Sequence, residues 1–244
     1  MSYISVVQWL IQKGFAKTSQ QAQELVHQKR VYRNGFPLDK GSTRVHLRDN
    51  IFIKDAGVYS YVSRGAQKLA SGFQRLNESV VPEWYVDVGA STGGFTDYLL
   101  RQGAQGVVAV DVGHHQLHER LQKDPRVISL ERTHVGKLRQ LPKPCHRCVA
   151  DVSFTSLKWI LPPVWDLLSS PRWCMMLFKP QFELPRKYIQ RGGVVGNEEV
   201  VAQYLHAFIS YVKTKYKILD VMSAPCEVRG KKKKNQEYWV LIRE

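Results

Sequence analysis

The spacing of hydrophobic residues predicts two helices and a small β-ribbon at the start of the chain. Apolar residues recur at helical spacing in two stretches, residues 4–11 and 22–26. A strand-like stretch follows, and its Asn-Gly pair at residues 34–35 predicts a tight hairpin turn. With a further strand near residues 50–53, residues 1–55 are expected to form a small α+β domain.

A start signal precedes the second of these helices. Thr18 and Gln21 are three residues apart, which is the spacing of a capping box. We therefore expect each of the two side chains to accept a hydrogen bond from the other residue's free backbone N–H.

Beyond residue 63, short apolar runs alternate with helical stretches, and residues 56–62 between the two blocks are the expected linker. Strands are expected over residues 84–88, 107–111, 126–130, 147–152, 173–178, 216–222 and 237–242. Helices are expected near residues 65–76, 94–102, 115–122, 156–168 and 197–213. Strands separated by helices of this length predict an α/β, Rossmann-like domain over residues 63–244, with a mostly parallel sheet. The last two strands are joined by a loop, so the final strand is expected to be antiparallel.

Charge and composition narrow the functional classes. The 244 residues carry 36 Lys and Arg against 21 Asp and Glu, a net charge of +15, which favours a polyanionic partner such as nucleic acid or an anionic membrane face. No apolar stretch approaches the roughly 20 residues of a membrane span, and no secretory signal is visible. Four cysteines are too few to form a disulfide scaffold at this length. We expect a cytoplasmic protein, and the sequence does not give its oligomeric state.

The strongest local motif is a glycine-rich turn between the first strand of the second block and the next helix. It reads VDVGASTGGFT over residues 86–96, and the following strand ends in Asp111, about twenty residues on. A turn of this kind lets backbone approach a ligand, and an acidic residue at the second strand end accepts hydrogen bonds from ribose hydroxyls. Asp87 would repel a pyrophosphate, so a nucleoside with a cationic end fits better. That description suits S-adenosylmethionine, and a turn that binds no ligand is the alternative.

Four charged residues stand at the edges of predicted elements, where doubly wound sheets place their active sites. They are Lys68, Asp151, Lys179 and Glu237. Asp151 and Lys179 directly follow apolar strands, where an unpaired charge is costly. Taken singly, each is more often a solvated charge than a catalyst, but their joint position around the glycine-rich turn favours a catalytic group.

Several segments of the sequence match a known family. From Ser63 onward the chain resembles the hemolysin A (TlyA-type) ribosomal RNA methyltransferases, relatives of the FtsJ-like ribose 2'-O-methyltransferases. The matching phrases include SRGAQKL, DVGASTGGFTDYLL, ADVSFTSL, FKPQFE and NQEYWV. Residues 1–55 resemble the S4 RNA-binding domain of that family. His114-His115 departs from the family, which usually has a glycine-containing pair there.

The resemblance implies a cofactor, a catalytic group and a substrate. It implies S-adenosylmethionine bound by Asp87, Gly89, Ala90, Ser91, Gly93, Gly94, Phe95 and Asp111. It implies a Lys-Asp-Lys-Glu tetrad of Lys68, Asp151, Lys179 and Glu237, in which we expect Lys179 to be the general base. It also implies ribosomal RNA or ribosomal subunits as the substrate, modified at a cytidine. We expect the RNA to be gripped by basic residues: Lys29, Arg30, Arg33, Arg64, Lys231, Lys232, Lys233 and Lys234.

Two further clusters are weaker as metal sites, and no metal is expected. Cys145 and Cys148 have C-x-x-C spacing but no second pair at a suitable distance, so free thiols are favoured over zinc. His114, His115 and His118 have no acidic partner positioned among them in the sequence.

Two other functions remain alternatives to the methyltransferase. One is a membrane-lytic hemolysin, which the family's older name suggests. The other is a non-catalytic RNA-binding module that assists ribosome assembly.

Overall fold

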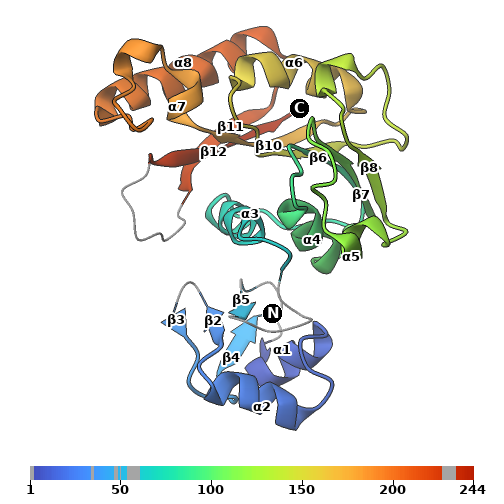
Figure 1. Ribbon diagram of the computed structural model, residues 1–244. Coiled ribbons are helices and arrows are strands. Elements are labelled where there is room, and N and C mark those ends of the chain that lie inside the picture. Colours follow the sequence, from blue (N-terminus) through green and yellow to red (C-terminus); the bar gives the residue numbers. More distant parts are fainter. Residues whose placement is uncertain (1–2, 34–35, 47–48, 50, 54–60, 227–234) are drawn as a thin grey trace. The chain divides into compact units, whose positions relative to one another are not determined.

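The structure is a computed structural model that describes residues 3–33, 36–46, 49, 51–53, 61–226 and 235–244. The chain forms two compact units, Met1–Val62 and Ser63–Glu244 (Figure 1). Most of the predicted linker over residues 56–62, and all four lysines of residues 231–234, lie outside the described residues.

The first unit is a small α+β fold with one hydrophobic core. Its elements are β1 (Tyr3–Ser5), α1 (Val6–Gln12), α2 (Ser19–His27), β2 (Val31–Arg33), β3 (Phe36–Pro37), β4 (Arg44–His46) and β5 (Ile51–Ile53). Strand β2 pairs antiparallel with both β3 and β5, and β1 pairs antiparallel with β4. The core forms where one face of each helix meets the ribbon, and Trp9 and Phe15 stack within it with ring centroids 5.5 Å apart.

The start signals of the two helices differ from the prediction. Thr18 accepts a hydrogen bond from the Gln21 N–H as expected, but the Gln21 side chain accepts from the Lys17 N–H, so only half of the predicted capping box forms. The complete box lies at the first helix, between Ser5 and Gln8. Because Ser5 caps α1, Ile4, which the sequence places in the helical stretch, belongs to β1 instead.

The second unit is a seven-stranded sheet with helices on both faces. Its strands are β6 (Trp84–Val88), β7 (Gly106–Val110), β8 (Val127–Leu130), β9 (Arg147–Ala150), β10 (Trp173–Phe178), β11 (Asp220–Cys226) and β12 (Glu237–Arg243). Its helices are α3 (Gly65–Arg75), α4 (Gly94–Arg101), α5 (Glu119–Gln122), η2 (Val135–Lys137), α6 (Leu157–Leu167), α7 (Pro180–Glu183), η3 (Arg186–Tyr188) and α8 (Glu198–Lys215).

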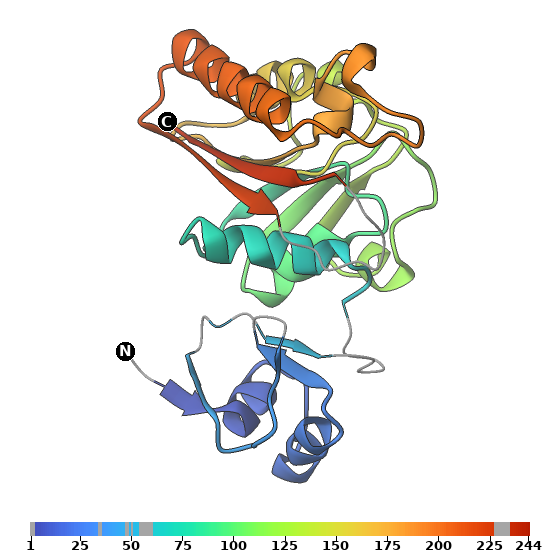
Figure 2. The same ribbon diagram turned by 90° about the vertical axis from the view of Figure 1, so that its left-hand side faces the viewer.

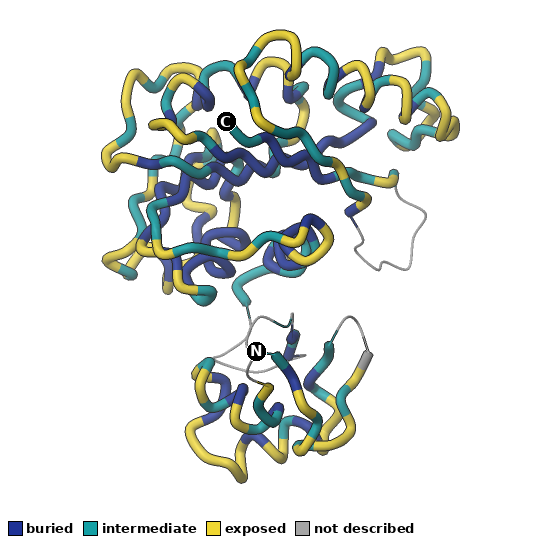
Figure 3. The backbone as a smooth tube through the Cα atoms, turned by 180° about the vertical axis from the view of Figure 1, so that it is seen from behind, coloured by how far each residue is buried: buried dark blue, intermediate teal, exposed yellow. Residues whose placement is uncertain are grey.

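The strand order of this sheet is β11-β12-β10-β9-β6-β7-β8. Strands β6 to β10 are parallel, and β12 lies antiparallel between β10 and β11, as predicted. Helices α3 and α4 cover one face of the sheet and α6 and α8 the other (Figures 1 and 2). The central strands are therefore buried on both sides (Figure 3), which explains their continuous apolar sequences.

Two predicted elements of this unit are wrong in extent. The helix expected over residues 115–122 is reduced to α5, because the backbone N–H groups of His115, Gln116 and Leu117 donate to the Glu131 carboxylate instead of continuing a helix. The strand expected over residues 216–222 is shifted to β11, because α8 runs on to Lys215 and pairing with β12 sets the register.

Within the described part of the chain, no helix combines the length and apolar character needed to cross a membrane.

Candidate active site

A cleft of about 880 Å³ opens at the carboxyl ends of the central strands. The glycine-rich turn follows β6, Asp151 follows its neighbour β9, and Lys179 follows β10. The order of the strands reverses at β6 and β9, and such a switch point is where doubly wound sheets bind ligands. The cleft is lined by Ser63, Arg64, Gly65, Lys68, Gly89, Ala90, Ser91, Thr92, Gly94, Phe95, Asp151, Ser153, Lys179, Gln181, Phe182, Arg186, Ile189, Gly192, Gly193, Val194, Cys226, Asn235 and Glu237.

The four charged residues singled out in the sequence converge in this cleft. Lys179 Nζ lies 2.5 Å from Asp151 Oδ1, and Lys68 Nζ lies 3.3 Å from Asp151 Oδ2. Lys68 Nζ is also 2.9 Å from Glu237 Oε2. Two amines and two carboxylates from four different elements thus form one connected group, with Asp151 shared between the lysines.

The two lysines differ in their surroundings. Burial alone would lower the pKa of Lys68, but the nearby carboxylates of Asp151 and Glu237 outweigh it and hold this pKa above its usual value. Lys68 is therefore an ammonium at neutral pH. Lys179 is only 7% exposed, has one carboxylate partner among the described residues, and donates a hydrogen bond to Ser153 Oγ at 3.1 Å.

The glycine-rich turn packs directly against the backbone that follows β9, at Asp151. Gly89 has a φ of +82°, and a Cβ there would lie 2.7 Å from the Asp151 carbonyl oxygen. Gly94 is equally confined, because a Cβ there would lie 2.2 Å from Ser63 Oγ. These glycines thus bring the turn, the start of α3 and the end of β9 together around the cleft.

Asp87 lies beneath the turn rather than in the cleft. Its side chain is fully buried, and its Oδ2 accepts hydrogen bonds from the Thr96 N–H at 3.0 Å and the Thr96 hydroxyl at 2.7 Å. Its Oδ1 has no donor among the described residues. Burial raises the pKa of Asp87 to about 7. A direct contact of Asp87 with a cofactor stays a prediction.

Asp111 lies just after β7, at the position where ribose recognition was expected. Its Oδ2 accepts from the Ser91 N–H and its Oδ1 from the Gly113 N–H, both at 2.7 Å. A carboxylate has about four acceptor positions, so this geometry leaves two for sugar hydroxyls. The residues lining the cleft include five of the eight predicted cofactor-binding residues, but not Asp87, Gly93 or Asp111.

Sequence reasoning missed an aromatic surface beside the tetrad. Phe154 is 90% exposed, and its ring centroid lies 5.1 Å from that of Phe182, which lines the cleft. Phe154 has a φ of +63°, a conformation that bulky side chains rarely adopt. The available signal was the apolar ring in the polar loop directly after Asp151 and Ser153.

The predicted RNA-binding residues occupy different surroundings. Arg64 lines the cleft, whereas Lys29, Arg30 and Arg33 belong to the first unit. Lys29 is exposed, but Arg33 is paired with Asp49 at 3.1 Å. The lysines at 231–234 lie outside the described residues, so their role stays a prediction.

The structure agrees with the interpretation of the cysteine pair but changes that of the histidine cluster. Cys145, Cys148 and the remaining two cysteines are buried thiols. The histidine cluster does have an acidic neighbour, contrary to expectation: Glu131, which follows β8, lies beside His114 and His115.

Comparison with known proteins gives consistent results over nearly the whole chain. The FtsJ-like methyltransferase model matches residues 61–244, and the S4 domain model matches residues 6–51. The 16S/23S rRNA (cytidine-2'-O)-methyltransferase TlyA of Mycobacterium tuberculosis is 38% identical over 196 residues, which cover 80% of this chain and 73% of that protein. Hemolysin A of Brachyspira hyodysenteriae is 33% identical over 206 residues, covering 82% of this chain and 84% of that protein.

Solved structures with a similar fold include proteins with related names. A Streptococcus thermophilus structure named as a hemolysin has a TM-score of 0.70 and 30% identity, and the match covers all of this chain and 89% of that chain. A Listeria monocytogenes structure named as an S-adenosylmethionine-dependent methyltransferase has a TM-score of 0.52 over 74% of this chain and 98% of that chain, and its 13% identity shows the shared fold alone. On the fold, the two matched models and these relatives, the chain belongs to the FtsJ-like methyltransferase family, with an S4 domain preceding the methyltransferase domain.

Proposed function

We propose that the protein is an S-adenosylmethionine-dependent ribose 2'-O-methyltransferase that acts on ribosomal RNA, with cytidine as the target nucleotide. The observation that carries the proposal is the convergence of Lys68, Asp151, Lys179 and Glu237 in one cleft beside the glycine-rich turn. The target class is supported by the TlyA relative, whose name states a cytidine-2'-O activity on 16S and 23S rRNA. Ribosomal subunits would then be its partners and the cytoplasm its place of action.

The residues around the turn fit S-adenosylmethionine. The cleft volume of about 880 Å³ lies within the ~300–1,000 Å³ of small-molecule sites. The Asp111 carboxylate has free acceptor positions for ribose hydroxyls, and the buried Oδ1 of Asp87, beneath the turn, has no hydrogen-bond donor among the described residues. Ala90, Ser91 and Phe95 would supply the wall along the cofactor. When bound, the cofactor supplies an electrophilic methyl group on a sulfonium.

The tetrad can remove the proton that a ribose hydroxyl must lose as it attacks. Lys68 stays an ammonium between two carboxylates, which leaves Lys179 as the amine available to accept that proton. Asp151 positions both amines, and Glu237 offsets the charge of the Lys68 ammonium, which lies on the other side of Asp151 from Lys179. Positioning of the hydroxyl in line with the methyl group would supply much of the remaining rate.

The aromatic surface suits a nucleotide substrate. The Phe182 ring lies beside Lys179 and the Phe154 ring beside Phe182, and RNA bases taken out of a helix stack on such rings. We infer that Lys29, which is exposed on the S4 domain, and Arg64, which lines the cleft, contact RNA phosphates.

The direct test is transfer of a labelled methyl group from S-adenosylmethionine to purified ribosomal subunits and to naked RNA, followed by mass spectrometry of the nucleosides. A 2'-O-methylcytidine product is expected. Calorimetric titration with S-adenosylmethionine separates this proposal from a non-catalytic RNA-binding module, because such a module need not bind it. Leakage of liposomes caused by the folded protein, without methyl transfer, would instead support the lytic alternative.

A further inference from the structure

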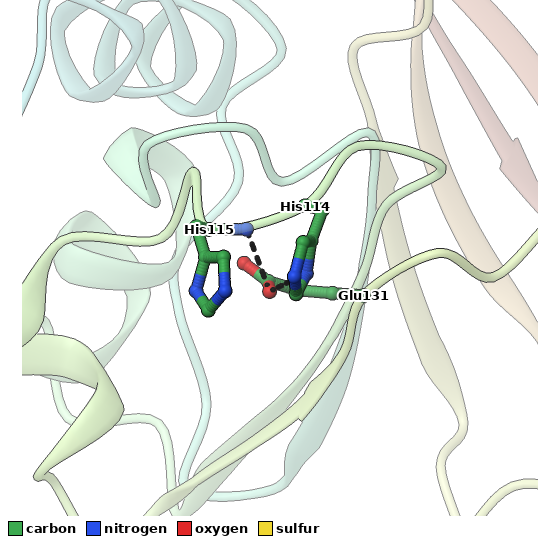
Figure 4. A group of neighbouring side chains, drawn as sticks. All are labelled: His114, His115 and Glu131. Atoms are coloured by element: carbon green, nitrogen blue, oxygen red, sulfur yellow. Dashed lines mark hydrogen bonds and ion pairs between the residues drawn. The ribbon is translucent and has the colours of Figure 1, made fainter.

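His114, His115 and Glu131 bring three metal-binding groups together outside the cleft residues described above. The two histidines follow β7 and the glutamate follows β8, so neighbouring parallel strand ends place them side by side (Figure 4). One ligand atom from each residue lies within 4.8 Å of the other two. The two imidazole centroids are 3.6 Å apart, and His114 Nδ1 is 3.3 Å from Glu131 Oε2.

The Glu131 carboxylate is held in a fixed position. Oε2 accepts a hydrogen bond from the His115 N–H at 2.9 Å, and Oε1 accepts from the Gln116 N–H at 3.1 Å. These bonds keep the carboxylate beside both rings, so one ligand is already ordered before any ion arrives.

The two rings are used differently from nearby histidines. His118 and His134 each accept a backbone N–H at Nδ1 and thereby cap short helices. His114 and His115 have no such capping role among the described residues, and both are exposed.

We propose that His114, His115 and Glu131 bind one divalent transition-metal ion of the zinc type. Imidazole nitrogens and a carboxylate oxygen are ligands that such ions accept, and three protein ligands leave one position open. With metal–ligand distances of about 2.0–2.2 Å, ligand atoms of a tetrahedral site lie about 3.4 Å apart. The pair of His114 and Glu131 already has this spacing at 3.3 Å. The His115 ligand atom lies within 4.8 Å of the other two, so it must move closer to them to complete the site.

The test is calorimetric titration of metal-free, untagged full-length protein with ZnCl₂. One Zn²⁺ per chain is expected. His114→Ala and His115→Gly should each weaken the affinity at least about tenfold, since even groups that only orient metal ligands contribute 10- to 100-fold. Glycine is chosen at residue 115 because its φ is +52°. The matched control is His206→Ala, an exposed histidine on α8, which should bind like the wild type.

Thermal melting with and without ZnCl₂ gives a second readout. Zn²⁺ should raise the melting temperature of the wild type and of His206→Ala, and much less that of the two loop variants. The loop variants carry the test, rather than a Glu131 variant, because Glu131 also holds the loop backbone. Zn²⁺ affinity and melting shift that are the same in all four proteins, or absent in the wild type, would overturn the proposal.

Discussion

Replacing Lys179 with methionine removes the proposed base while keeping an unbranched side chain at a site that is only 7% exposed. A positioned general base contributes about 10²–10⁴ in rate. At about 1.36 kcal/mol per factor of ten, this corresponds to a barrier higher by about 2.7–5.4 kcal/mol. The expected result is a fall of at least 100-fold in the rate constant of methyl transfer, by the same estimate.

The variant should stay folded because Asp151 keeps a partner. Removing one member of a buried ion pair costs about 3–5 kcal/mol when the other charge is left unpaired. Here Lys68 Nζ remains 3.3 Å from Asp151 Oδ2, so we expect a loss of only about 1–2 kcal/mol in the free energy of unfolding.

The assay is single-turnover methyl transfer from labelled S-adenosylmethionine to ribosomal subunits, with both substrates saturating. Lys213→Met is the matched control, because Lys213 is an exposed lysine on α8, and it should react like the wild type. Cofactor affinity, measured by calorimetry, should be unchanged in both variants. A folded Lys179→Met protein that methylates at the wild-type rate would refute the assignment of Lys179 as the base.

Three further predictions follow from the environments of Asp87, Gly89 and Phe154. Because the folded-state pKa of Asp87 is about 7 against an ordinary 3.8, the folded protein retains a proton that the unfolded chain has released between these values. The free energy of unfolding should therefore fall as the pH rises through this window. In urea melts at pH 5 and pH 8, Asp87→Asn should lose this difference. The same change in unfolding free energy between the two pH values in both proteins would contradict the prediction. Gly89→Ala should lower the free energy of unfolding by about 1–3 kcal/mol or more, since it adds a clash with the Asp151 carbonyl to a strained φ. An equal loss in Gly103→Ala, where φ is +101° and nothing lies within 4 Å, would reject the clash. Phe154→Gly removes a stacking surface worth about 1–3 kcal/mol per base, so KM for the RNA should rise without loss of thermal stability. An unchanged KM would exclude base stacking there.

The placement of the tetrad could be predicted because strand ends are visible in sequence. Asp151 and Lys179 directly follow apolar runs, and the carboxyl ends of parallel strands meet at one edge of a sheet. The charge of each residue and its position were enough to expect a shared site, although not which lysine would have two carboxylate partners. That distinction depends on where Glu237 lies, at the start of the antiparallel strand β12.

Element boundaries were less predictable where a distant side chain competes with local propensity. The sequence predicts a helix from residue 115, but the N–H groups of His115, Gln116 and Leu117 donate to the Glu131 carboxylate. The helix therefore starts only at Glu119. Likewise, pairing with β12 places β11 later in the chain than the strand predicted over residues 216–222. Both effects involve partners far along the chain, and no local pattern contains them.

By itself, the sequence determined the α/β class, the parallel core with its antiparallel last strand, the glycine-rich turn and the residues of the tetrad. The elements and the turn follow from the period of apolar residues and from steric limits on backbone, which act over a few residues, whereas the tetrad follows from the positions of four charges at element edges and from the family resemblance. Only the tertiary structure decided that Asp87 is buried beneath the turn, that Phe154 faces solvent, and that Glu131 lies beside His114. Burial and electrostatic environment are set by atoms from separate elements, and these are brought together only when the sheet and its covering helices have packed.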